Sequence, residues 1–327
     1  MRWDDLQVLV TGAGGFIGSH LTERLCALGA RTRALVRYGS SGTAGWLDRS
    51  PVRDDVEIVA GDLRDRDSVA RAMRGVDVVF HLGALIGIPY SYEAPDAYVQ
   101  TNVVGTLNVL QAARSAGTAR VVHTSTSEVY GSAQYVPIDE RHPLRGQSPY
   151  SASKIGADKL AESFFLSFET PVVTVRPFNT YGPRQSTRAV IPTIITQCLA
   201  GDVVRLGHLT PTRDLTFVAD TVEGFLAAAA SPAAVGRTIN LGNGREIAVG
   251  QLANRIAGQL HRTVRIECTE ERQRPEGSEV DRLLADNALA RDLLGWAPRV
   301  GLDEGLRRTI EWMEAHRALY RADVYAV

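Results

Sequence analysis

The chain has 327 residues, of which 44% are hydrophobic and 22% are charged, as in an ordinary globular enzyme. This length is near the upper limit of one domain, or it makes two unequal lobes. With 36 basic and 37 acidic residues the net charge is −1, which gives no electrostatic reason to expect nucleic acid or a membrane surface as a partner.

The three cysteines, Cys26, Cys198 and Cys268, are far apart and form no CxxC or Cys/His pattern typical of a metal site. We therefore expect no bound metal and a reduced, cytoplasmic protein. The longest apolar run, around residues 225–230, is far shorter than the roughly 20 residues that a membrane helix needs.

Short apolar runs alternate with amphipathic stretches over the first 176 residues. The runs lack polar alternation, which is typical of strands buried on both faces of a parallel sheet. The predicted strands are 6–10, 32–36, 56–59, 76–82, 120–124 and 171–176, and the predicted helices are 18–28, 68–73, 97–116 and 151–167. This order predicts a Rossmann-type, doubly wound α/β fold that binds ligands at the carboxyl ends of its strands.

The pattern changes after residue 176, where prolines and glycines become frequent up to about residue 220. Helices are predicted at 191–200, 218–230, 249–259 and 302–316. We expect residues 1–176 to form the first lobe and residues 177–327 to form most of a smaller α/β lobe, with the chain crossing between the two.

A glycine-rich segment, Gly12-Ala-Gly14-Gly15-Phe16-Ile17-Gly18, joins the first predicted strand to the first predicted helix. Glycines at such a turn let the backbone approach a pyrophosphate, whose charge then faces a helix N-terminus. This context predicts a dinucleotide site. Its expected contacts are Gly12, Gly15, Phe16, Ile17 and Gly18.

Two further positions bear on which dinucleotide is bound. Asp62, followed by Leu63 after the third strand, could accept the adenine amino group. The second strand ends in Arg37, where an NAD-binding chain more often has an acidic residue for the ribose hydroxyls. Arg37 instead suits a 2′-phosphate and favours NADP, although a solvated loop arginine is an equally good interpretation.

Tyr150 and Lys154 are four residues apart on a predicted helix, so their side chains share one face. The lysine charge is expected to lower the pKa of the phenol and make Tyr150 a usable base. Thr126, at the end of the fifth strand, could hydrogen-bond the same substrate oxygen. Both Tyr150 and Lys154 are also expected to contact the cofactor.

Four segments resemble those of extended short-chain dehydrogenase/reductases that act on nucleotide sugars: residues 12–18, Ser125–Gly131, Tyr150–Lys154 and Arg176–Arg184. Within that family the sequence is most similar to 4,6-dehydratases of the legionaminic acid type. The resemblance implies a tightly bound NAD or NADP that is regenerated in each cycle, a nucleotide-sugar lobe and a homodimer.

The resemblance also implies a chemistry for residues 126–128. After oxidation of the sugar at C4, Glu128 could remove the C5 proton and the C6 hydroxyl would leave, with Ser127 or a water assisting its protonation. The thymidine-diphosphate glucose dehydratases have Asp where this chain has Ser127, but GDP-mannose dehydratases share the Thr-Ser-Glu sequence.

The second lobe is expected to hold the substrate diphosphate. Asn179 and Arg213 resemble the family's diphosphate ligands, and Arg274 or Arg282 could add another, because guanidinium forks fit phosphate oxygens.

Three alternatives to dehydration stay open. A UDP-glucuronate decarboxylase would need a cation for the C6 carboxylate, which Arg184 or Arg282 could supply. A C4 epimerase needs only Thr126, Tyr150 and Lys154, so it gives no reason for Glu128. A non-enzymatic NADP sensor is disfavoured because such proteins usually lack part of the Tyr/Lys pair.

Overall fold

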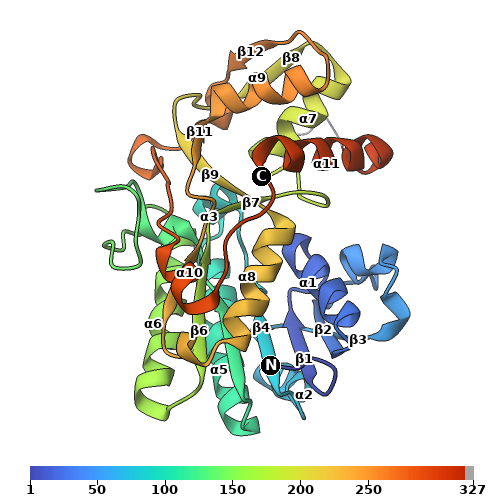
Figure 1. The fold of residues 1–327 in the computed structure, drawn as a ribbon, viewed down its shortest axis with the longest axis vertical. Helices are drawn as coiled ribbons and strands as arrows, with labels where there is room; N and C mark the ends of the chain where they lie inside the picture. The colour runs from blue at the N-terminus through green and yellow to red at the C-terminus, as the bar shows by residue number, and fades with distance from the viewer. Residues whose placement is uncertain (321–327) are drawn as a thin grey trace.

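A seven-stranded, wholly parallel sheet forms the base of the molecule in the computed structural model, which describes residues 1–320 (Figure 1). The strand order is β10-β6-β5-β4-β1-β2-β3. The expected doubly wound α/β fold is therefore confirmed. The strands are β1 (Gln7–Thr11), β2 (Arg31–Arg37), β3 (Val56–Gly61), β4 (Val78–His81), β5 (Arg120–Thr124), β6 (Val172–Pro177) and β10 (Thr238–Leu241).

Helices cover both faces of this sheet. In the interior strand β1, Val8 and Val10 pack in one core with side chains of α1 and α8, whereas Leu9 packs in another with α2, α5 and α6. Because both faces are buried, most interior positions of the strands are apolar. The helices are α1 (Phe16–Ala27), α2 (Arg66–Ala72), α5 (Gly105–Ala116), α6 (Pro149–Phe168), α8 (Val218–Ala230) and α10 (Ala288–Leu294).

A smaller lobe stands above the carboxyl ends of the strands (Figure 1). It holds the three-stranded sheet β11-β9-β7, the parallel pair β12-β8 and three helices. Its strands are β7 (Asn179–Tyr181), β8 (Val203–Leu206), β9 (Thr212–Phe217), β11 (Glu246–Ala248) and β12 (Arg265–Cys268), and its helices are α7 (Val190–Ala200), α9 (Val249–Gln259) and α11 (Leu302–Ala315).

Between these elements the chain returns to the larger lobe to add α8, β10 and α10. The expected boundary at residue 176 therefore marks only where most of each lobe lies. Residues 321–327 of the expected second lobe are outside the described residues.

The predicted helix 97–116 is wrong in one respect. Two short helices, α3 (Ile88–Glu93) and α4 (Pro95–Tyr98), precede a π-helical segment, η3 (Val99–Val104), and regular α-helix begins only at Gly105. The extra residue per turn rotates the side chains of this segment, which matters for the site below.

Within residues 1–320 no helix has both the length and the apolarity to cross a bilayer. The same residues contain no grouping of three His, Cys, Asp or Glu side chains suited to hold a metal ion.

Candidate active site

The glycine-rich loop connects β1 to α1 next to the segment that follows β4. Gly12 has a φ of +70°, and a Cβ there would lie 2.9 Å from the Gly83 backbone. A Cβ on Gly18 would lie 2.2 Å from the Gly12 carbonyl oxygen. Only glycine therefore fits at these two positions.

The N-terminus of α1 is open to an anion. Its N-cap residue, Gly15, makes no side-chain capping bond, and the first turn contains no acidic residue. The first-turn amides, which include those of Phe16 and Ile17, have no acceptor inside the helix. This end of the helix fits the pyrophosphate of a dinucleotide.

Arg37 and Asp62 lie side by side at the carboxyl ends of neighbouring strands, since Arg37 pairs in register with Gly61. Hydrogen bonds from Arg64, one of them 2.6 Å long, lower the pKa of Asp62. The backbone oxygen of Leu63 accepts a bond of 2.8 Å from Asn108. Arg37 is exposed, so its guanidinium can reach a ligand at this edge.

Tyr150 and Lys154 lie in the first turns of α6, where a capping box between Ser148 and Ser151 fixes the helix start. Thr126 lies close enough to the Tyr150 hydroxyl to lower the pKa of the phenol. Lys154 Nζ donates to the Thr124 carbonyl oxygen at 2.6 Å. The three expected residues thus converge at the end of β5.

The expected effect of Lys154 on the phenol is wrong for this state of the protein. Burial raises the pKa of Tyr150, and the nearby Glu128 charge raises it further, while Thr126 lowers it. Burial also lowers the pKa of Lys154 to about 8. Desolvation dominates because both groups are enclosed and the ammonium is bound to a backbone carbonyl rather than to the phenol.

Glu128 lies on the 3₁₀ segment η4 (Ser127–Tyr130), which begins where Thr126 Oγ1 accepts the Glu128 amide at 3.2 Å. Glu128 as a whole residue is 9% exposed, and its Oε2 is 3.8 Å from Arg274 Nη1. Ser127 is buried beside it. A carboxylate is therefore held next to the Thr/Tyr pair.

Asp158 was missed by sequence reasoning. It accepts hydrogen bonds from His123 Nε2 at 3.0 Å, Ser125 Oγ at 2.7 Å and Arg176 Nη2 at 2.9 Å. Burial alone would raise the pKa of Asp158, but the His123 bond and the Arg176 charge hold it at about 2. The available signal was its spacing, four residues after Lys154 on the same helix face.

Asn102 was also missed. It lies in the π-helical segment, where its amide bonds both backbone groups of Leu85, at 2.8 and 2.9 Å, and Ser153 Oγ at 2.9 Å. It thereby ties the loop after β4 to the helix that carries Tyr150. Single π-turns of this kind are often found at functional sites.

The expected diphosphate residues fall into two groups. Arg213 is buried and binds Glu279 at 3.3 Å, and Arg274 lies between Glu128 and Glu279, 3.9 Å from the latter. In the described residues, Arg274 Nη1 and Asn179 Oδ1 are buried polar atoms without a hydrogen-bond partner. Buried groups of this kind call for a ligand or water.

Two other arginines are engaged elsewhere. Arg282 is half exposed and forms a bidentate pair with Glu246, with bonds of 3.0 and 2.9 Å from Nε. Arg184 binds Glu23 at 2.8 Å and Ser19 at 3.1 Å, both on α1.

The sequence matches the family described as GDP-mannose 4,6 dehydratase over residues 9–309. It is 36% identical over 313 residues to a UDP-glucose 4-epimerase of Mycolicibacterium smegmatis, covering 94% of this chain and 98% of that protein. A dTDP-glucose 4,6-dehydratase of Streptomyces antibioticus is 33% identical over 318 residues, or 96% and 94% of the two chains.

Among solved structures, DesIV (dTDP-glucose 4,6-dehydratase) from Streptomyces venezuelae with NAD and TYD bound superposes with a TM-score of 0.85. Its identity is 32%, and the match covers 96% of this chain and 99% of that one.

The fold, the glycine loop and the Tyr/Lys helix define an extended short-chain dehydrogenase/reductase. The chain belongs to the GDP-mannose 4,6-dehydratase family within that class, and it is an NAD(P)-dependent enzyme acting on nucleotide sugars.

Proposed function

We propose that the protein is a nucleotide-sugar 4,6-dehydratase that converts an NDP-hexose or NDP-N-acetylhexosamine to the 4-keto-6-deoxy sugar. The observation that carries this proposal is the Glu128 carboxylate, buried within the electrostatic reach of Tyr150 and close to Thr126. Reactions that only oxidise and reduce C4, such as epimerisation, need no base at C5 and so give Glu128 no role.

NAD(P), which the glycine loop at Gly12–Gly18 would hold, would supply the acceptor for the C4 hydride and the donor that delivers it to C6. Thr126 donates a hydrogen bond to O4, and Tyr150 takes the O4 proton as a phenolate, a form that burial disfavours in the protein alone and that the positive charge of an oxidised nicotinamide would favour. The C4 ketone acidifies the C5 hydrogen, which Glu128 removes. The C6 hydroxyl then leaves as water with the proton that Tyr150 took from O4, passed on through Ser127 or a bound water, and Glu128 returns its own proton to C5.

We further propose that Asn179, Arg213 and Arg274 bind the substrate diphosphate. The unpartnered buried atoms of Asn179 and Arg274 support this role, as does the buried charge of Arg213. The bidentate pair with Glu246 removes Arg282 from this set.

C4 epimerisation is the second candidate, because the relative from M. smegmatis is a UDP-glucose 4-epimerase and Thr126, Tyr150 and Lys154 suffice for it. Decarboxylation is disfavoured. The two arginines that could hold a C6 carboxylate, Arg184 and Arg282, are bound to Glu23 and Glu246.

The reactions separate by product mass. The purified enzyme is incubated with UDP- and GDP-N-acetylglucosamine, thymidine-diphosphate glucose and UDP-glucuronate. Loss of one water from any substrate supports the proposal. Loss of carbon dioxide, or an unchanged mass with a new retention time, overturns it in favour of decarboxylation or epimerisation.

The preference for NADP is part of the proposal and rests on Arg37. An Arg37→Ala variant should bind NADP at least tenfold more weakly and NAD unchanged, measured by fluorescence titration. Equal losses for both cofactors would contradict a 2′-phosphate contact.

We also propose a cytoplasmic homodimer with a legionaminic acid type of substrate, an N-acetylhexosamine nucleotide. Light scattering of the purified protein tests the dimer, and the substrate panel above tests the sugar.

A further inference from the structure

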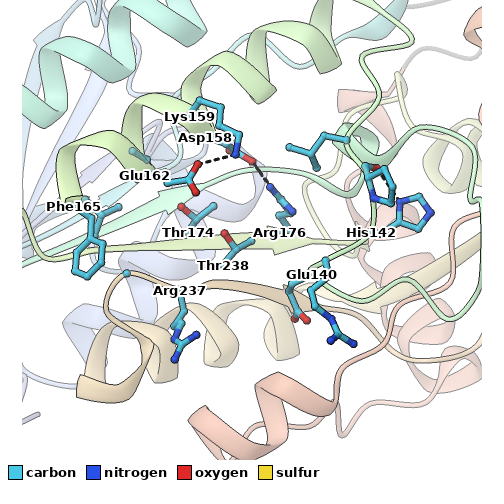
Figure 2. Close-up of a pocket in the computed structure, with 16 residues that line it drawn as sticks. Glu140, His142, Asp158, Lys159, Glu162, Phe165, Thr174, Arg176, Arg237 and Thr238 are labelled. Atoms are coloured by element: carbon cyan, nitrogen blue, oxygen red, sulfur yellow. Dashed lines mark hydrogen bonds and ion pairs between the residues drawn. The ribbon is translucent and has the colours of Figure 1, made fainter. Parts of the chain in front are cut away.

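A cavity of about 330 Å³ lies between α6, β6, β10 and the loop at residues 140–144 (Figure 2). The residues proposed for catalysis do not line it. Its size is at the lower end of those that hold small molecules.

The walls of this cavity are mixed in chemistry. Thr174 and Thr238 present hydroxyls from the neighbouring strands β6 and β10, with Phe165 and Val172 as apolar surface. In Figure 2 the two threonines lie next to each other, between Phe165 and Glu140. Hydroxyls beside an aromatic face suit a sugar ring.

The acidic residues of the cavity are already neutralised or occupied. Glu162 pairs with Lys159 at 2.7 Å, and Asp158 pairs with Arg176 at 2.9 Å. The Glu140 carboxylate accepts a hydrogen bond of 2.8 Å from the backbone N–H of Asn240.

Arg237 remains. No hydrogen bond, ion pair or ring contact engages its guanidinium within residues 1–320, although it lines the cavity. Its charge is therefore available to an anion.

We propose that this cavity binds a monosaccharide phosphate, with the phosphate on Arg237 and the ring hydroxyls on Thr174 and Thr238, and that its occupancy changes turnover at the active site. The inner wall provides the connection. Arg176 donates to the Tyr130 hydroxyl at 3.0 Å, and Tyr130 belongs to the same 3₁₀ segment as Glu128. Asp158 receives the Ser125 hydroxyl next to Thr126. A ligand touching Asp158 and Arg176 therefore contacts the groups that support the catalytic residues.

The binding test uses N-acetylglucosamine 1-phosphate and, separately, inorganic phosphate in calorimetric titrations. We expect Arg237→Ala to raise the Kd of the sugar phosphate at least tenfold and Thr238→Val to raise it severalfold. Arg71→Ala, at an exposed arginine on α2 near the opposite edge of the sheet, is the matched control and should leave the Kd unchanged.

Arg213→Gln separates this cavity from the nucleotide-sugar site. Loss of binding in that variant with retention in Arg237→Ala would overturn the proposal, as would no binding at all. Inorganic phosphate binding as tightly as the sugar phosphate would refute a sugar-specific site. These titrations need no activity, so they stand apart from the proposed dehydration.

The effect on turnover is measured with saturating sugar phosphate on whichever nucleotide sugar the enzyme converts. We expect kcat to change at least twofold in the wild type and not in Arg237→Ala. An unchanged kcat in the wild type would refute the coupling.

Discussion

Glu128 is the residue that distinguishes the proposed dehydration from the alternative reactions. Replacing it by Gln keeps its size but removes the base for the C5 proton, so turnover should fall by about 10²- to 10⁴-fold. Product formation followed by mass spectrometry checks this. Ser127→Ala is the control, with a smaller loss expected because water can replace its hydroxyl. Full dehydratase turnover in Glu128→Gln would refute the assignment.

Lys154 gives the site its pH dependence. With a pKa of about 8, its ammonium is largely charged at neutral pH and loses its proton as the pH rises through 8. We expect kcat to be steady between pH 6 and 7 and to decline above about pH 8, because the cationic form supports proton transfer through Tyr150. A Lys154→Arg variant should move the decline to higher pH. A wild-type profile flat to pH 9.5 would contradict this.

The sequence predicted the groups that we propose to carry the reaction, but not the groups that hold them in place. Thr126, Tyr150 and Lys154 meet because strand ends and helix faces obey fixed periodicities. Asp158 and Arg176 are brought together by the packing of α6 against β6, which no local spacing reveals. The raised pKa of Tyr150 was missed for the same reason, since burial is a property of the folded molecule.

The ion pair of Asp158 on α6 with Arg176 on β6 joins this helix to the sheet. Asp158→Asn should lower the free energy of unfolding by about 3 kcal/mol, because it leaves Arg176 buried without its counter-charge. Denaturant unfolding measures this. Glu162→Gln, an exposed acid on the same helix, should change stability by no more than about 0.5 kcal/mol.

The same carboxylate makes stability depend on pH. Its folded pKa, about 2, lies below the unfolded value, so its contribution is complete above about pH 4 and is lost as the pH falls toward 2. Asp158→Asn should unfold with a weaker acid dependence in that window. An unchanged acid dependence would show that other carboxylates dominate.

The glycine loop sets the geometry of α1. Gly18→Ala would bring a methyl group to within 2.2 Å of the Gly12 carbonyl oxygen, so the loop must open. We expect cofactor affinity to fall at least tenfold, measured by titration with NAD and NADP. Gly258→Ala in α9, where a Cβ meets nothing within 4 Å, should leave affinity unchanged and raise stability by about 0.5–1 kcal/mol. Equal behaviour of the two variants would contradict a steric role.

Elements with a long, regular period were predictable, and the others were not. Six of the seven strands of the parallel sheet, and α6, were expected at nearly their observed positions, whereas β10 (Thr238–Leu241) was not predicted. The π-helical turn at Val99–Val104 was not, because its residues read as ordinary helix and only the bonds of Asn102 to Leu85 and Ser153 select it. The strands of the smaller lobe were missed because they are only three to six residues long.

For the whole molecule, the relation between the lobes predicts how a truncated chain behaves. A fragment of residues 1–176 lacks β10 and α8, so the edge of β6 and the core around Val173 and Val175 would be exposed. We expect this fragment to be insoluble or to lack cooperative thermal unfolding, measured by circular dichroism. A stable, NAD(P)-binding fragment would instead support an autonomous first lobe.

The position of β10 also affects biosynthesis. The ribosome must complete β7, β8, β9 and α8 before the last strand of the large sheet exists, which takes on the order of several seconds at usual elongation rates. During that interval β6 presents unpaired backbone groups to the cell. The large sheet of the first lobe therefore cannot be completed before much of the second lobe has been synthesised. Binding of the nascent chain by chaperones should be greatest while the residues after Pro177 emerge from the ribosome.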